Sequence, residues 1–576
     1  MAKAKKAVPI TTDEDRQLLY SYVMELYDYE TAKEIIAKYE NNLFGKNGLA
    51  FIIGRMSLPF FCQYFLQDTF RPKPDNAARA LAPFHFEMWD ALEGLFIEDK
   101  YDKLELVVPR GSSKTTTCDF ALTVWAHCYN QSLYTLVCGK TEQDATEFVR
   151  NIKHCFLENE YIISVFGRLI IEHNSNYTVN NLELELTNGT KIQAIGSATS
   201  MRGKKYGNHR PTLIIADDYQ GKADIESQEA RDKKYTLWVQ DCGMAGDKAV
   251  YRDGKKIKMA TKFVVLGTLL HHDCFMSRLL KDSTYKHFVR RAINIDNIDE
   301  YFSSGLWGEF KRILFDPKDP HAEENAKEFY YQHQQEMQYP VLWPDKYDCL
   351  DLALNDYYPN PLSFKIEMQN DIRQEGTKAF HTIKTASFVD IEKNDYKITI
   401  LCCDPAVETG KTNDYTALAV VGKTANNFRW VRRGIIAKLS FDQYIENVIS
   451  LLEVYQDITH VWVEKNTFNG ADVREIRQRI SEHDTIKHRK IEIINERQNK
   501  NKESKIRAIG GKVDNGVIIF NEEDTDFNEQ VLSYSGEVTS AHDDAPDIIA
   551  EADRLVDVLA VSLPLLRVLP LSYLGL

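Results

Sequence analysis

The sequence predicts an α/β protein that contains two successive α/β blocks. From about residue 103, short apolar runs alternate with longer helical or polar segments, a pattern typical of buried, largely parallel strands joined by helices. The same alternation resumes near residue 397, after a polar and irregular stretch. With 576 residues, the chain has room for roughly two to four domains.

Four segments are expected in order: a helical region at 1–80, a first α/β domain at 81–345, a connector at 346–394 and a second α/β domain with a tail at 395–576. In the first domain, we expect strands at KLELVV, LYTLVC, TLIIADD and KFVVLGTLL, and a hairpin that turns at Asn188-Gly189. In the second domain, strands are expected at KITILCCDPA, TALAVVGK, FRWVRRGII and HVWVEKN, and a final helix at about 544–560.

The overall charge does not point to a partner. The chain has a net charge of −14, with 43% hydrophobic and 27% charged residues, and a DNA-binding protein needs only one basic face. Its ten cysteines include no CxxC pair, which favours reduced thiols over a disulfide framework or a zinc site. We find no apolar run of about 18–20 residues and therefore expect no membrane span. The start, MAKAKKAVPI, is not followed by the apolar stretch of a secretory signal.

A candidate phosphate-binding loop lies in LELVVPRGSSKTTT, where a strand leads through small residues into a helix. Lys114 is suited to the β- and γ-phosphates, and the Thr115 hydroxyl is suited to Mg²⁺. Val108 and Ser113 replace the two glycines of the usual pattern, and an ordinary strand-to-helix turn is the alternative. The loop that would surround the nucleotide comprises Arg110, Gly111, Ser112, Ser113, Lys114, Thr115 and Thr116.

A second part of this site is expected at the end of the apolar run LIIADD. Asp217 can hold Mg²⁺, and Asp218 can orient the attacking water. Two aspartates at a strand end can also simply begin a turn. Combined with Lys114 and Thr115, however, they indicate a nucleotide site.

These residues resemble the ATPase part of the large subunits of viral DNA-packaging terminases. In that family an arginine stands four places before the lysine, as Arg110 does here. The run ATSMRGKKYGNHR contains Arg202, which the resemblance suggests as an arginine finger for a neighbouring subunit's ATP, with Arg110 as the alternative within the same chain. The resemblance also suggests that Gly267 and Thr268 couple hydrolysis to movement.

Three departures from the family pattern are visible. Ser113 stands in place of a glycine, and Asp218 stands where many members have glutamate. The segment LAPFHFEMWDALE offers His85 but not the usual adenine-reading glutamine. The residue that orients water and the group that reads the base are therefore the weakest parts of the match.

A second constellation of acidic residues occupies the second block. Asp404 follows the apolar run ITILCC, Glu464 follows HVWV, and Asp543, Asp544 and Asp547 precede or open the last helix. Carboxylates from strand ends and a helix start can converge on two metal ions about 4 Å apart that cleave a phosphodiester. Each residue alone has a plain alternative, because aspartates commonly cap helices.

In their order, these acidic residues resemble the RNase H-like nuclease domain of terminases. The resemblance implies metal binding by Asp404, Glu464, Asp544 and Asp547. Both of the last two could approach the metals, and Asp544 is slightly favoured as the main third ligand. It also extends to Asp414-Tyr415 and Asn466.

A basic stretch lies beside this constellation. Residues 474–512 contain twelve Lys or Arg and six Asp or Glu. Within it, Lys502, Lys505 and Arg507 are candidates for DNA phosphate contacts, and a solvated loop is the alternative.

The resemblance extends over about residues 80–560. It implies a P-loop ATPase domain of the ASCE type followed by an RNase H-like nuclease domain, with ATP and Mg²⁺ as cofactors and Mn²⁺ as an alternative at the nuclease site. Implied partners are double-stranded DNA, the portal protein, a small terminase subunit and further copies in a ring on the prohead, with a monomer in solution as the alternative. The implied location is the host cytoplasm. Two rival functions are a helicase–nuclease of DNA repair and a nucleotide-binding scaffold whose acidic cluster is inert.

Overall fold

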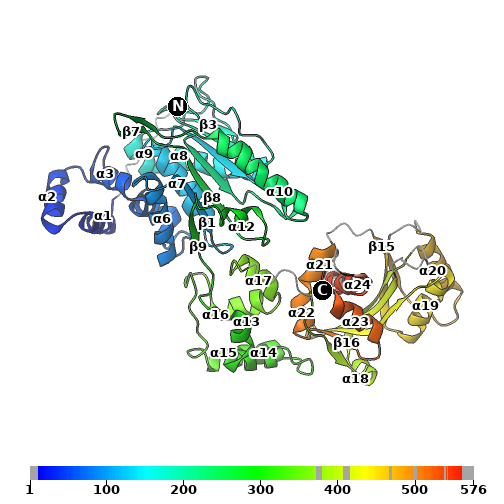
Figure 1. Cartoon of the computed structure of the whole chain (residues 1–576). Coiled ribbons are helices and arrows are strands. Elements are labelled where there is room, and N and C mark those ends of the chain that lie inside the picture. The colour runs from blue at the N-terminus through cyan, green and yellow to red at the C-terminus, as the bar shows by residue number, and fades with distance from the viewer. Residues whose placement is uncertain are drawn as a thin grey trace, which may run out of the picture. The chain divides into compact units, whose positions relative to one another are not determined.

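A computed structural model describes residues 11–371, 379–406, 415–465, 470–496, 502–536, 540 and 542–560. The predicted residues Asp414 and Asn466 and the tail from 561 lie outside these ranges. The chain divides into two compact units. Unit 1 comprises Met1–Asn294, Tyr339–Asp348 and Lys365–Glu375, and unit 2 comprises Ile295–Gln338, Cys349–Phe364 and Gly376–Leu576 (Figure 1).

The described part of unit 1 begins with five helices between Asp13 and Phe70. The first helix is fixed by a capping box in which Thr12 and Asp15 satisfy each other's backbone N–H groups. The helices of unit 1 are α1 (Asp13–Leu26), α2 (Tyr29–Tyr39), α3 (Leu49–Met56), α4 (Leu58–Phe65), α5 (Gln67–Phe70), α6 (Pro83–Phe96), η1 (Thr115–Phe120), α7 (Ala121–Cys128), α8 (Glu142–Glu158), α9 (Glu160–Phe166), η2 (Lys222–Asp224), α10 (Gln228–Leu237), η3 (Trp238–Cys242), α11 (Gly243–Ala245) and α12 (Phe275–Leu279).

The sheet of unit 1 has seven strands in the order β3-β4-β2-β5-β8-β1-β9. Only β3 and β4 pair antiparallel, forming the hairpin predicted around Asn188-Gly189. Strand β8 lies between β1 and β5, and this inserted strand defines the ASCE type of P-loop sheet. The strands are β1 (Lys103–Val107), β2 (Tyr134–Gly139), β3 (Glu183–Glu185), β4 (Lys191–Gly196), β5 (Leu213–Asp217), β8 (Lys262–Gly267) and β9 (Lys286–Val289), and a separate hairpin is formed by β6 (Val250–Arg252) and β7 (Lys255–Lys258).

The strand register brings the sequence motifs of unit 1 to one edge of the sheet. Val107 at the end of β1 is level with Gly267, and Asp217 is level with Leu266. The phosphate loop, the two aspartates and the Gly-Thr pair therefore all follow the carboxyl ends of neighbouring parallel strands, where ligands of open α/β sheets bind.

The sheet of unit 2 has the order β10-β16-β13-β12-β11-β14-β15. Strands β11, β12 and β13 are antiparallel, while β14 and β15 run parallel to β11. This arrangement is RNase H-like, with β11 between β12 and β14. The strands are β10 (Lys384–Ala386), β11 (Tyr396–Asp404), β12 (Thr416–Thr424), β13 (Arg429–Ala437), β14 (Ile458–Glu464), β15 (Glu492–Glu496) and β16 (Ile518–Asn521).

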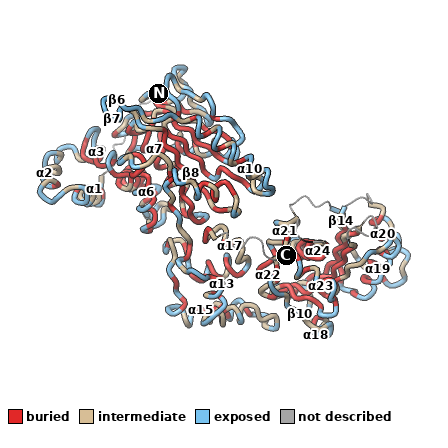
Figure 2. Tube along the Cα trace, in the orientation of Figure 1, coloured by how far each residue is buried: buried red, intermediate tan, exposed pale blue. Residues whose placement is uncertain are grey.

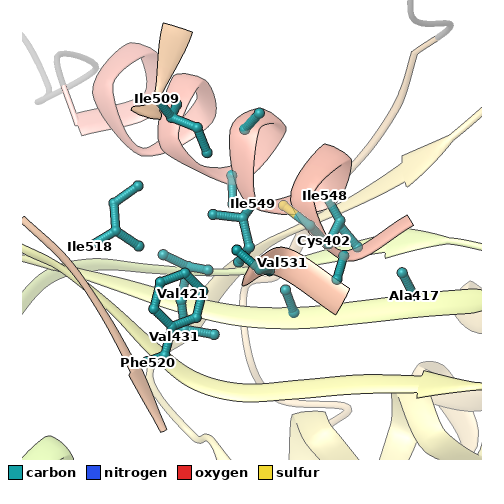
Figure 3. Packing of buried hydrophobic residues seen from close by; sticks show 14 of the residues in the cluster. Cys402, Ala417, Val421, Val431, Ile509, Ile518, Phe520, Val531, Ile548 and Ile549 are labelled. Carbon is teal, nitrogen blue, oxygen red and sulfur yellow. The ribbon is translucent and has the colours of Figure 1, made fainter. Parts of the chain in front are cut away.

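Helix α24 (Asp544–Ala560) covers one face of this sheet. Ile548 and Ile549 of α24 pack among Cys402, Ala417 and Val421 of the central strands (Figure 3). This apolar packing fixes the rotation of α24 about its axis. The rotation determines which acidic side chains of α24 face the end of β11. Both sheets form buried layers (Figure 2).

Residues 295–338, which lie within the segment expected as the first α/β domain, contain helices and belong to compact unit 2. The domain boundaries expected at residues 80, 345 and 394 remain predictions. The other helices are α13 (Ile298–Ser303), α14 (Gly305–Leu314), α15 (Ala322–Gln332), α16 (Cys349–Asp351), η4 (Leu352–Tyr357), α17 (Pro361–Glu367), α18 (Phe388–Glu392), α19 (Phe441–Val454), α20 (Ala471–Glu482), α21 (Lys502–Ala508), α22 (Gly510–Asp514) and α23 (Thr525–Ser533). Among the described residues, no helix is long and apolar enough to cross a membrane.

Candidate active sites

The loop after β1 has the backbone of a phosphate cradle. Gly111 has a φ of 75° and Ser113 a φ of 59°, so the chain twice enters the left-handed region before the helix begins. Ser113 thus adopts a conformation that favours glycine, which explains why a glycine is usual at that position. The Ser112 hydroxyl donates to the Pro109 carbonyl at 2.7 Å and stabilises the turn.

The lysine and the two aspartates meet at the edge of the sheet. Lys114 is 7% exposed, and its Nζ lies 3.4 Å from Oδ1 of Asp218. Asp218 has a φ of 43°, and its N–H donates to the Leu266 carbonyl of β8 at 3.1 Å. Asp218 is therefore tied to the strand that ends at Gly267.

The surroundings of Asp217 are suited to binding a cation. It is 1% exposed, and neither carboxyl oxygen has a partner in hydrogen-bonding geometry. Burial and the charge of Asp218 raise its pKa to about 6, although Lys114 and the nearby Thr115 hydroxyl lower it. A buried carboxylate without a partner is costly, and the residues present would fit Mg²⁺ held by Asp217 and Thr115.

A cavity of about 280 Å³ adjoins the loop. Ser113, Thr116 and Thr117 line one side of it, and Phe70 and Trp343 offer aromatic faces elsewhere in the lining. His85 also lines the cavity, but it is fully buried and its Nδ1 accepts from the Ala82 N–H at 3.0 Å. The cavity is suitable for a nucleobase, while His85 acts in the structure as a helix cap.

Three further side chains contact the phosphate loop or the Gly267-Thr268 pair. Lys346 donates through Nζ to the Gly111 carbonyl, and the Tyr347 hydroxyl donates to the Arg110 carbonyl at 3.2 Å. Both lie in the segment LWPDKY. The side chain of Gln220 donates to the Thr268 carbonyl at 3.4 Å and links the segment after Asp218 to the Gly-Thr pair.

The two candidate arginine fingers are both exposed and both paired. Arg110 lies 2.8 Å from Glu367, and Arg202 lies 2.7 Å from Asp241. Each would have to leave its carboxylate in order to reach a phosphate.

In unit 2, Asp404, Glu464 and Asp547 come together. One carboxylate oxygen of each lies within 4.8 Å of the other two. Asp404 ends β11, Glu464 ends β14, and Asp547 lies in the first turn of α24. The parallel pairing of β11 and β14 brings the first two together, and the packing of α24 adds the third.

The electrostatics of this carboxylate centre favour a bound cation. Removal from water raises the pKa of Asp404 well above its usual range. The neighbouring Glu464 and Asp547 raise it further, and Lys502 opposes them. Three converging carboxylates are typical ligands of Mg²⁺ or Mn²⁺, and the residues present would fit such an ion.

Asp544 does not belong to this group. Its Oδ2 accepts from Nε2 of Gln530 in α23, at 3.4 Å, and the Gln530 side-chain carbonyl accepts from the N–H of Ala545. Asp543 instead pairs with Lys502 at 2.8 Å. The geometry thus supports Asp547 rather than Asp544, the residue favoured from the sequence, as the third ligand.

The basic residues proposed for DNA contact turn inward to carboxylates. Lys505 is 9% exposed and lies 2.5 Å from Asp547, and Lys502 lies 3.7 Å from the same residue. Arg507 pairs with Glu503 at 2.9 Å. In this state Lys502 and Lys505 neutralise the carboxylate centre, a role that the local charge count alone does not reveal.

No protein-family model matches the chain, and no curated protein does. Similar solved structures include the large terminase of a thermophilic bacteriophage, with 11% identity, a TM-score of 0.43, and coverage of 84% of this chain and 100% of that one. The human cytomegalovirus terminase nuclease domain has 18% identity, a TM-score of 0.25, and coverage of 31% and 92%. A nuclease domain of the large terminase subunit of bacterial virus Sf6, solved with manganese, has 10% identity, a TM-score of 0.21, and coverage of 28% and 93%. At such identities the similarity concerns the fold, and it identifies no residue roles.

Proposed function

We propose that this chain is a viral DNA-packaging motor that hydrolyses ATP to move double-stranded DNA into a prohead and cuts concatemeric DNA with a two-metal endonuclease. One observation carries the proposal: a single chain has a lysine–aspartate phosphate site on an ASCE sheet and a three-carboxylate centre on an RNase H-like sheet. Neither site alone would distinguish a motor from a simple ATPase or nuclease.

In the proposed ATPase, the loop from Arg110 to Thr116 surrounds the phosphates. Lys114 neutralises the β- and γ-phosphates, and Thr115 and Asp217 hold Mg²⁺. Asp218 orients the attacking water, and its link to Leu266 connects that water to β8. Gly267 and Thr268 at the end of β8 are the proposed coupling residues.

In the proposed nuclease, Asp404, Glu464 and Asp547 hold the metal ions, and Asp544 supports the start of α24. Bound metals would supply an activated water and stabilise the leaving oxygen. Lys502 and Lys505 would be released from Asp547 when metal binds and could then meet the DNA backbone. We expect little sequence preference, because phosphate contacts carry no base information.

The remaining partners are also part of the proposal. They are the portal protein, a small terminase subunit and neighbouring copies in a ring on the prohead, all in the host cytoplasm. In such a ring, Arg202 would reach the ATP of the next copy, with Arg110 as the alternative. Mixing Arg202→Ala with Lys114→Ala chains tests this choice: recovered ATPase activity supports Arg202, and no recovery in any mixture excludes it.

The full-length protein allows a direct test of the proposed function. We expect ATP hydrolysis that DNA stimulates, Mg²⁺- or Mn²⁺-dependent nicking of a plasmid, and no unwinding of a forked duplex. Strand separation would favour the helicase–nuclease. Nucleotide binding without hydrolysis or nicking would favour the scaffold.

A further inference from the structure

The hairpin β6–β7 stands out on the surface of unit 1. Its turn residues Asp253 and Gly254 have φ values of 50° and 74°, as a two-residue type I′ turn requires. Of its strand residues only Lys258 is partly buried, and Figure 2 shows the hairpin as exposed. Two ion pairs nevertheless hold the second strand, because Lys256 pairs with Asp99 at 2.5 Å and Lys258 with Asp247 at 2.6 Å.

The hairpin carries positive charge that nothing in the described part of the chain neutralises. Residues 248–258 contain five basic residues and one acidic residue, although the whole chain has a net charge of −14. Lys248, Arg252 and Lys255 are exposed, and no carboxylate of the described residues pairs with their side chains. The remaining two lysines serve to fasten the hairpin.

A second basic segment contacts the chain just before the hairpin. Residues 202–210 contain four Lys or Arg and no acidic residue. Arg210 donates to the carbonyls of Met244 and Gly246, at 2.9 and 3.4 Å, just before the hairpin begins. Arg210, Lys248, Arg252 and Lys255 are named the hairpin surface.

The position of the hairpin links it to the nucleotide site. The hairpin leads directly into β8, whose amino end pairs with the start of β5. The other end of β8 carries Gly267, and the Leu266 carbonyl accepts from the N–H of Asp218. A six-residue strand, about 20 Å long, thus runs from the hairpin surface to the residue proposed to orient water.

We propose that the hairpin surface binds the phosphate backbone of duplex DNA and that β8 transmits the state of the nucleotide site to it. This proposal rests on the motor function proposed above. Unpaired Arg and Lys side chains are suited to phosphates, and they offer no groove-reading element. Tyr251 and Ile257 are exposed on the same hairpin, and contact with a protein is therefore the competing outcome of the test.

The test compares two charge-matched double variants of the full-length protein. Arg252→Ala/Lys255→Ala removes two cations of the hairpin surface, while Lys33→Ala/Lys38→Ala removes two exposed lysines of α2. Binding of a short duplex is measured in chelator across a salt series. We expect the first variant to make the negative slope of log affinity against log salt shallower by about 1–2, since each phosphate contact contributes about −0.9, and the second to leave it unchanged.

ATPase assays separate this proposal from the proposed function. The hairpin variant should keep its ATPase activity without DNA and lose most of the stimulation by DNA. A wild-type protein without ATPase activity would refute the motor, whereas the salt slope would still report on the hairpin surface. If the salt slope of the hairpin variant equalled that of the wild-type protein, the proposal would be wrong. Reduced self-association of Tyr251→Ser/Ile257→Ser would then favour contact with a protein.

Discussion

Asp544 and Asp547 lie one turn apart at the start of α24, and their surroundings differ. Asp547 meets Asp404 and Glu464, while Asp544 meets Gln530. We expect Asp547→Asn to reduce metal-dependent cleavage by roughly 100-fold or more, since even indirect disturbance of a metal ligand often costs 10–100-fold. Asp544→Asn, the matched control, should retain most cleavage. Cleavage rates at saturating Mn²⁺ and thermal melting would check this pair, and the reverse order of severity would contradict the assignment.

The pKa of Asp217 is raised to about 6, which predicts that nucleotide binding at this site depends on pH. A raised carboxyl pKa means that the folded protein binds a proton more readily than the unfolded chain between about pH 4 and pH 6. Since Mg²⁺ needs the ionised form, the affinity for Mg·ATP should fall as the pH drops below about 6. Titrating a fluorescent ATP analogue at several pH values measures this, and Asp217→Asn should bind weakly at every pH. A wild-type affinity that stays constant down to pH 5 would exclude Asp217 as the metal-binding group.

At the scale of the element, Glu93 joins helices α6 and α4. Its carboxylate accepts from the N–H of Leu58 at 2.6 Å, and burial raises its pKa to about 7 even though this hydrogen bond lowers it. The folded-state pKa exceeds the unfolded value, so stability is lost as the pH rises from about 4.5 to 7. We expect Glu93→Gln to stabilise unit 1 above pH 7 by on the order of 1–2 kcal/mol after allowance for partial exposure.

Calorimetric melting curves at pH 5 and pH 8 test the Glu93 prediction. The variant should melt higher than wild type at pH 8 and similarly at pH 5. Asp75→Asn removes an exposed carboxylate of unit 1 and serves as the control, which should change the melting temperature at neither pH. Equal melting of Glu93→Gln and wild type at pH 8 would contradict the assigned pKa.

Buried strands were predictable from the sequence, because they appear in it as short apolar runs. The apolar runs located β1, β5, β8, β11 and β14, and in each unit most candidate site residues lie at or just beyond the carboxyl ends of these strands. The sequence does not show which of Asp544 and Asp547 lies beside Asp404 and Glu464, because that position depends on Gln530 in α23 and on the packing of α24. The pairing of Lys505 with Asp547 was not predictable either, because it depends on tertiary contacts and not on local composition. Helices α13–α15 were missed because they are short and rich in aromatic residues that pack against distant segments.

At the scale of the whole molecule, the two sites belong to separate compact units. Lys114, Asp217 and Asp218 lie in unit 1, and Asp404, Glu464 and Asp547 lie in unit 2. Each unit has its own sheet, and the carboxylate centre shares no side chain with the phosphate site. Loss of one chemistry should therefore not require loss of the other.

The most direct measurement assays ATP hydrolysis and plasmid cleavage side by side in full-length Lys114→Ala and Asp404→Ala proteins, with and without chelator. Lys114→Ala should lose ATPase activity and keep basal cleavage, while Asp404→Ala should lose cleavage and keep ATPase activity. Lys281→Ala, an exposed lysine of unit 1, should keep both. Undiminished cleavage by Asp404→Ala, cleavage in excess chelator, or wild-type ATP turnover by Lys114→Ala would contradict the assignment of two separate active sites.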